Sequence, residues 1–218
     1  MSADIEAIIN DSLRTDIYFS KASDFEKTKE FVKEVCAGRC ETHGFNHMDK
    51  IANLASYIAD KENLNSAASF DCVIIALLHD VADHKYDNGD LKKKLEAFLD
   101  ENFQEKKEFY LNAVDRISYS KEVKNGKEWL ETLGADGLVI RNVVSDADKL
   151  EAIGKNGLER CYQYGRSQGL DIDEASAHVV KHAEEKLLKL AEHFIRTKTG
   201  KELAEKLHKE MESELIYY

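Results

Sequence analysis

The chain has 218 residues, with 31 basic and 42 acidic side chains for a net charge of −11, and 43% of its residues are hydrophobic. This length is sufficient for one good hydrophobic core, and the apolar fraction is too high for a disordered protein. Because an acidic chain repels polyanions, the charge argues against a general binder of nucleic-acid polymers or membrane surfaces.

The absence of proline is the strongest indication of fold class. Average usage is roughly 5% proline, so its absence removes the main helix breaker from every position. With 11 glycines in addition, the composition favours an all-α helical bundle, which we expect to be one domain over residues 1–218. No segment approaches the ~18 apolar residues of a membrane span, and the amino terminus lacks a signal-peptide pattern. We therefore expect a cytoplasmic protein, with its oligomeric state left open.

The first third of the chain predicts three helices. Ser23 to Glu26 has the spacing of a capping box, which predicts a helix that continues until Gly38. A second helix is predicted over about 46–61, where apolar residues recur at helical spacing. The segment 73–78 is apolar on every side and fits a buried strand or a core helix, and its helical surroundings favour the helix.

The remaining elements follow from turn residues and apolar spacing. After Asn88-Gly89 we expect a helix through about 98 and another over 105–117, followed by a loop over 118–126. Residues 138–144 lead into a helix that continues through Cys161. The last third predicts two long helices separated near Thr199-Gly200.

Four cysteines, Cys36, Cys40, Cys72 and Cys161, form no C-x-x-C pair. They are too few for a disulfide scaffold in a chain of this length. We interpret them as reduced, buried thiols. His178 and His182 share one helical face, but no H-E-x-x-H glutamate lies between them, so we interpret His182 as structural.

The most informative doublet is His79-Asp80, at the end of the apolar run 73–78. Two strongly solvated groups at the end of a buried segment require pairing or a metal ion, because burial of an unpaired carboxylate is costly. Imidazole next to carboxylate suits a divalent transition metal. A hydrogen-bonded core histidine beside a capping aspartate is the alternative.

Two further groups strengthen the metal interpretation. His47 begins the predicted amphipathic helix upstream, and Asp148 lies in the acidic segment that also contains Asp146. A histidine, a His-Asp doublet about thirty residues later and an aspartate on a later helix resemble the signature of the HD-domain metal-dependent phosphohydrolase superfamily.

The resemblance extends over about residues 42–211 and is strongest for the small single-domain bacterial branch of that superfamily. Five segments are similar to that branch and occur in the same order: His47 to Ile51, Ala76 to Val81, Asp146 to Gly154, Gly157 to Cys161 and His182 to Leu190. Each motif is weak alone, whereas their order over most of the chain is specific.

This resemblance implies an all-α bundle that holds one divalent ion, of manganese, magnesium, nickel, cobalt or iron, through His47, His79, Asp80 and Asp148. Asp148 matches the family ligand because it directly precedes a basic residue and a leucine. Helix geometry leaves Asp146 open, since residues two apart point to nearly opposite faces and Asp146 shares the side of Leu150. The other carboxylate would cap a helix or orient a histidine.

Further site residues follow from the same resemblance. Asp83 occupies the position of an acid that handles the proton of the attacking water or leaving group, with a solvated loop acid as the alternative. Lys50, Lys85 and Lys149 adjoin the motifs and would neutralise phosphate oxygens. Lys50 and Lys149 are the better matches. His43 matches a family histidine that would contact phosphate or support the ligands.

The function implied is hydrolysis of a small phosphate ester or anhydride by metal-activated water. A nucleotide is the expected substrate class, and a triphosphate or pyrophosphate-type compound is favoured, although no base-recognition pattern is readable. A catalytically silent metal- or nucleotide-binding regulator is the alternative. A di-iron oxygenase of the same superfamily fits less well, because His84 is the only histidine between Asp80 and Asp148.

Overall fold

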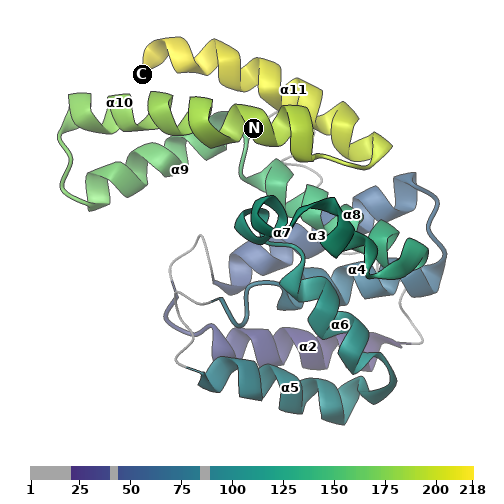
Figure 1. Ribbon diagram of the computed structural model, residues 1–218. Coiled ribbons are helices and arrows are strands. Elements are labelled where there is room, and N and C mark those ends of the chain that lie inside the picture. Colours follow the sequence, from purple (N-terminus) through teal and green to yellow (C-terminus); the bar gives the residue numbers. More distant parts are fainter. Residues whose placement is uncertain (1–20, 40–43, 84–88) are drawn as a thin grey trace. The chain divides into compact units, whose positions relative to one another are not determined.

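A computed structural model describes residues 21–39, 44–83 and 89–218, and all regular structure in these ranges is helical (Figure 1). The predicted all-α class is confirmed. The helices are α2 (Ala22–Val35), α3 (Phe45–Lys61), α4 (Ser66–Leu78), α5 (Asp90–Asn102), η2 (Gln104–Lys106), α6 (Lys107–Asp115), α7 (Tyr119–Glu131), α8 (Gly134–Glu151), α9 (Gly154–Ser167), α10 (Ile172–His182), η3 (Ala183–Leu187), η4 (Leu190–Phe194), α11 (Lys198–Glu214) and η5 (Leu215–Tyr217).

The chain divides into two compact units, whose boundary falls inside α8, between Ser145 and Asp146. The expectation of one domain over 1–218 stays a prediction. None of the described helices is long and apolar enough to cross a bilayer.

The core of the first unit is the pair α3 and α4, and α2 and α6 pack against α4 (Figure 1). The predicted apolar face of α3 is confirmed, because Ile51, Leu54 and Ile58 are fully buried. The segment 73–78 is confirmed as a central helix, with every residue from Val73 to Leu78 fully buried. Burial of each large aliphatic side chain contributes about 1.5 to 3 kcal/mol, so this pair is a rigid base for residues at its ends.

A side-chain cap is present at the start of α4 but not at the start of α2. Asn65 precedes α4 and its side chain accepts a hydrogen bond from the Ala68 amide at 3.0 Å. The predicted capping box at Ser23 is wrong, since α2 begins at Ala22 and its N-cap is Lys21, without a side-chain cap bond. Ser23 therefore lies inside the first turn, where a side chain cannot act as the N-cap.

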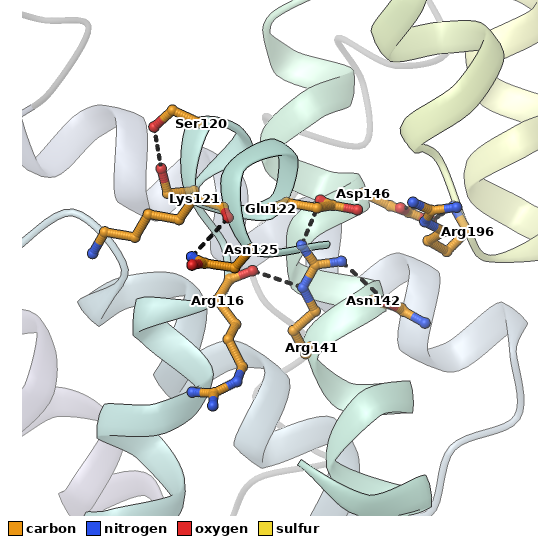
Figure 2. Close-up of polar contacts among 10 residues, drawn as sticks. Arg116, Ser120, Lys121, Glu122, Asn125, Arg141, Asn142, Asp146 and Arg196 are labelled. Atoms are coloured by element: carbon orange, nitrogen blue, oxygen red, sulfur yellow. Dashed lines mark hydrogen bonds and ion pairs between the residues drawn. The ribbon is translucent and has the colours of Figure 1, made fainter. Parts of the chain in front are cut away.

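The predicted loop over 118–126 is also wrong, because Tyr119–Glu131 is helix α7, interrupted at Gly126 where φ is 76°. A buried ion pair anchors this helix: Arg141 Nη2 donates to Glu122 Oε2 at 2.6 Å (Figure 2). Arg141 also donates through Nε to the Arg116 carbonyl at 2.7 Å. Within residues 118–126 the buried side chain is the polar Glu122, so apolar spacing did not indicate a helix there.

In the second unit, α9 packs against α10 and α11. The predicted continuous helix through Cys161 is instead two helices, since α8 ends at Glu151 and α9 begins at Gly154, where φ is 77°. Glycine adopts this left-handed conformation without a steric cost, so the chain turns there. Helix α10 begins with a capping box in which Asp171 and Glu174 each accept the other's backbone N–H.

The two last helices separate at residues 195–197 rather than at the predicted Thr199-Gly200. The run from α10 continues through the π-helical turns η3 and η4 to Phe194, and α11 then begins after Thr197. The Thr197 hydroxyl accepts a hydrogen bond from the Gly200 amide at 2.9 Å, so Thr197 is the N-cap.

Three cysteines lie in the described ranges and are free thiols, with Cys36 and Cys72 buried and Cys161 half-buried. Burial raises the pKa of all three thiols. They are therefore protonated at neutral pH. The predicted burial is confirmed for Cys36 and Cys72, whereas Cys161 is only half-buried. Cys40 lies outside the described residues.

Candidate metal centre

Packing of α3 against α4 brings three predicted ligands together in the first unit. His47 lies in the first turn of α3, and His79 and Asp80 directly follow the last residue of α4. Nε2 of His47 is 3.8 Å from Oδ2 of Asp80, and Nε2 of His79 is 3.7 Å from Oδ1. One ligand atom from each of the three side chains lies within 4.8 Å of the other two.

A backbone contact fixes the ring of His79. Its Nδ1 is 2.7 Å from the carbonyl oxygen of Ala76, one turn earlier. Because a carbonyl can only accept, Nδ1 holds the proton and donates it, and the lone pair of the neutral ring is then on Nε2, the atom that faces Asp80. Metal-binding histidines in proteins are usually oriented in this way.

The separations in the cluster fit a shared cation better than direct hydrogen bonds. Distances of 3.7 and 3.8 Å between Nε2 and carboxylate oxygen exceed the range of a hydrogen bond. Ligands that bind one ion at about 2.0 to 2.2 Å lie roughly 3 to 3.5 Å from each other. The histidine side chains are 5% and 2% exposed, whereas that of Asp80 is 24% exposed. Two nitrogens and one oxygen suit a divalent transition metal reached from the Asp80 side.

Arg39 contacts this turn, although the sequence did not indicate it as a site residue. Arg39 donates hydrogen bonds from Nη1 to the Asp80 carbonyl at 2.8 Å and from Nη2 to the Val81 carbonyl at 2.6 Å. It lies 41 residues before Asp80, outside the matched motifs. No local pattern in the sequence indicates this pairing.

The remaining predicted residues of the first half differ in their surroundings. Asp83 is half-buried and its backbone N–H donates to the Asp80 carbonyl at 3.2 Å, which places it one turn after the ligand. Lys50 is exposed on α3, three residues after His47. His43 and Lys85 lie outside the described residues.

In the second unit, the Asp146 carboxylate is fully buried. It lies next to Arg196 (Figure 2). It accepts from the Arg196 amide at 2.9 and 3.1 Å and from the Thr197 amide and hydroxyl, both at 2.7 Å. Burial raises the pKa of Asp146, and these hydrogen bonds oppose that rise. Asp146 therefore holds the residues that directly precede α11, and the helix itself is capped by Thr197.

Two predicted residues follow Asp146 on α8. Asp148 is half-buried and stays the predicted fourth ligand. Lys149 is only 2% exposed, and its charge lowers the pKa of the Asp146 carboxyl. Its ammonium group thus acts on Asp146, a partner that the sequence did not indicate.

An all-α fold with two histidines and an aspartate at adjoining helix ends defines a protein with the HD-like fold. The chain belongs to the family of YpgQ of Bacillus subtilis (strain 168), an uncharacterised protein to which it is 30% identical over 189 residues, covering 84% of this chain and 86% of YpgQ. Comparison with known family profiles gives no match.

Solved structures support the same fold. Bacillus subtilis YpgQ in complex with ADP superposes with a TM-score of 0.66 at 24% identity, covering 90% of this chain and 93% of that one. An HD-superfamily hydrolase from Bacillus thuringiensis superposes with a TM-score of 0.63 at 27% identity, covering 90% and 95%.

Proposed function

We propose that this protein is a divalent-metal-dependent phosphohydrolase of the HD superfamily that acts on a nucleotide or a related small phosphate anhydride. The observation that carries the proposal is the cluster of His47, His79 and Asp80, with the His79 ring turned toward Asp80 by the Ala76 carbonyl. The HD-superfamily hydrolase from Bacillus thuringiensis supports the reaction class. The ADP complex of YpgQ supports a nucleotide as ligand.

The ligand set proposed for one divalent ion is His47, His79, Asp80 and Asp148. A bound divalent cation supplies Lewis-acid activation of water and neutralises charge on phosphate. Asp148 is preferred to Asp146 because the Asp146 carboxylate already accepts four hydrogen-bond contacts at the start of α11.

Two further residues have proposed roles in the reaction. Asp83, one turn after Asp80, receives the proton of the attacking water or delivers one to the leaving oxygen. Lys50 is an exposed cation three residues from His47, and it binds phosphate oxygens. We assign phosphate binding first to Lys50 rather than to Lys149, whose side chain is buried and acts on Asp146.

The test is a product assay with ADP, ATP and other nucleotides in the presence of manganese, magnesium, nickel, cobalt or iron. Chromatography follows both phosphate and pyrophosphate release. We expect the wild-type protein to turn over at least one nucleotide, His79→Ala to lose turnover and metal, and His193→Ala to retain both. His193 is a suitable control because its side chain is 65% exposed and outside the cluster.

The ADP complex of YpgQ also fits a nucleotide-binding protein without turnover. The same assay separates the two functions when it is combined with calorimetric titration of ADP. Tight binding of ADP without release of any product, at full metal occupancy, would favour the silent regulator and contradict the phosphohydrolase.

A further inference from the structure

The guanidinium group of Arg39 donates two hydrogen bonds to the backbone of the turn that contains Asp80 and Val81. Its two terminal nitrogens donate separately, Nη1 to the carbonyl of Asp80 at 2.8 Å and Nη2 to the carbonyl of Val81 at 2.6 Å. Both acceptors belong to the turn that follows α4. One half-buried side chain from the connection after α2 thus contacts the backbone that holds two of the three clustered ligands.

The end of a helix is where such a contact matters most. The Asp80 and Val81 carbonyls lie just beyond the last residue of α4, near the negative end of the helix dipole, and the Asp80 carbonyl also accepts the Asp83 amide at 3.2 Å. A planar guanidinium with two parallel N–H groups satisfies two neighbouring carbonyls at once, which a lysine ammonium cannot reproduce in the same geometry. The bond pair therefore restrains the backbone from which the Asp80 side chain projects.

The turn that follows α2 positions the Arg39 side chain. Helix α2 ends at Val35, Gly38 adopts a φ of +81°, and the Arg39 amide donates to the Cys36 carbonyl at 3.1 Å. The charges of Arg39 and Asp80 shift the pKa of the Cys36 thiol in opposite directions, so both lie near it. Arg39 thus projects from a tight turn that the buried Cys36 anchors to the unit.

We infer that Arg39 is a positioning residue for the metal centre: its paired hydrogen bonds to the Asp80 and Val81 carbonyls hold His79 and Asp80 in ligand geometry. This role rests on the metal site of the proposed function. A positioning role and an electrostatic role predict opposite effects of Arg39 removal on metal affinity. A nearby positive charge repels a cation, so removal of the charge alone would tighten metal binding, whereas loss of the restraint weakens it.

The test is calorimetric titration of Mn²⁺ into metal-free wild type, Arg39→Gln and Arg39→Lys. Partners that orient metal ligands typically contribute about 10- to 100-fold to affinity, and we expect a loss of that size for Arg39→Gln. We expect a smaller loss for Arg39→Lys, because an ammonium group can still donate one hydrogen bond to this turn although it cannot reproduce the paired geometry. The control is Arg116→Gln in the same unit. Arg116 is buried and also donates to two backbone carbonyls, those of Asn112 and Trp129, away from the ligand turn.

Arg116→Gln should lose thermal stability while its affinity for Mn²⁺ stays within twofold of the wild type. Unchanged or tighter binding by Arg39→Gln, with normal binding by the wild type, would overturn the role of Arg39 alone. A wild-type protein that binds no Mn²⁺ would refute the metal site itself, and the role of Arg39 with it.

Two additional readouts protect the test from a general loss of stability. The Co²⁺-loaded protein has an absorption spectrum that reports ligand geometry, and we expect it to change in Arg39→Gln but not in Arg116→Gln. In the metal-free protein, hydrogen exchange at the amides of Val81 and Asp83 should accelerate at least tenfold in Arg39→Gln. Unchanged exchange at both amides would contradict the restraint, whatever the protein binds.

Discussion

Asp146 and Thr197 lock the beginning of α11 to α8 within the second unit. Both oxygens of the Asp146 carboxylate accept N–H groups from the chain at Arg196 and Thr197, and the Thr197 hydroxyl donates to Oδ2 at 2.7 Å. The same hydroxyl oxygen accepts from the Gly200 amide, so one buried carboxylate indirectly orders the first turn of α11. The lock lies two residues before the predicted ligand Asp148.

Asp146→Ala should destabilise the protein by about 2 to 4 kcal/mol, because it leaves buried backbone N–H groups without an acceptor. Thr197→Ala should lower the unfolding free energy by about 1 to 2 kcal/mol, as is usual for loss of an N-cap hydroxyl. Thr197→Ser keeps the hydroxyl and should retain most of the wild-type stability. Denaturant unfolding of the metal-free proteins measures these differences. Equal stability of Asp146→Ala and wild type would show that the carboxylate does not hold α11.

Gly200→Ala reverses the sign expected from helix propensity. Alanine in a helix is about 1 kcal/mol better than glycine, and Gly200 lies inside the first turn of α11. A Cβ at this position would stand 2.6 Å from both Asp146 Oδ2 and Thr197 Oγ1. We therefore expect a net loss of about 1 to 3 kcal/mol, as is typical of overpacking. Unfolding midpoints measure the effect, and a more stable Gly200→Ala protein would contradict this crowding.

The helices with an apolar face could be predicted from sequence. Apolar spacing records which side of a helix faces the core. It therefore predicted the buried face of α3, with Ile51, Leu54 and Ile58, and the fully buried run 73–78 of α4. The pair His79-Asp80 stood out for the same reason, as polar groups at the end of a buried helix.

The parts that escaped prediction depend on polar partners far along the chain. Helix α7 is anchored by Glu122 on Arg141, 19 residues away, and a glutamate in a charged segment gives no sign of burial. The hydrogen bond from Arg39 to the Asp80 carbonyl joins residues 41 positions apart. The sequence favoured Asp148 over Asp146 as a ligand, but it gave no sign of the contacts that Asp146 makes with residues 196–197, about fifty positions later.

His182 should make the protein less stable in mild acid. Burial lowers the pKa of His182 below its usual 6.5, the charges of Lys186 and His178 act in the same direction, and Glu185 opposes them. The unfolded chain therefore binds a proton at higher pH than the folded chain does. The stability contribution is complete above pH 6.5 and is lost as pH falls through the lowered folded pKa.

Unfolding free energies of metal-free wild type and His182→Gln, measured between pH 7.5 and about pH 5, test this sign. The difference should shift in favour of His182→Gln as pH falls, because glutamine takes up no proton. His193→Gln, at an exposed position on the same helical run, should keep the wild-type pH dependence. Parallel curves for wild type and His182→Gln would contradict the lowered pKa.

Asp83→Asn should separate proton transfer from metal binding. Asp83 lies one turn after Asp80, where its carboxylate is proposed to move a proton during attack on phosphorus. General acid–base groups typically contribute about 10² to 10⁴ in rate, so kcat should fall by that factor at saturating metal. The affinity for Mn²⁺ should stay within about threefold, because asparagine has nearly the same shape and no ligand is removed.

The control is Asp60→Asn, an exposed acid near the opposite end of α3 from His47, which should retain full turnover and metal. Loss of Mn²⁺ binding in Asp83→Asn would make Asp83 a ligand instead, and full turnover with intact metal would return it to a solvated loop acid.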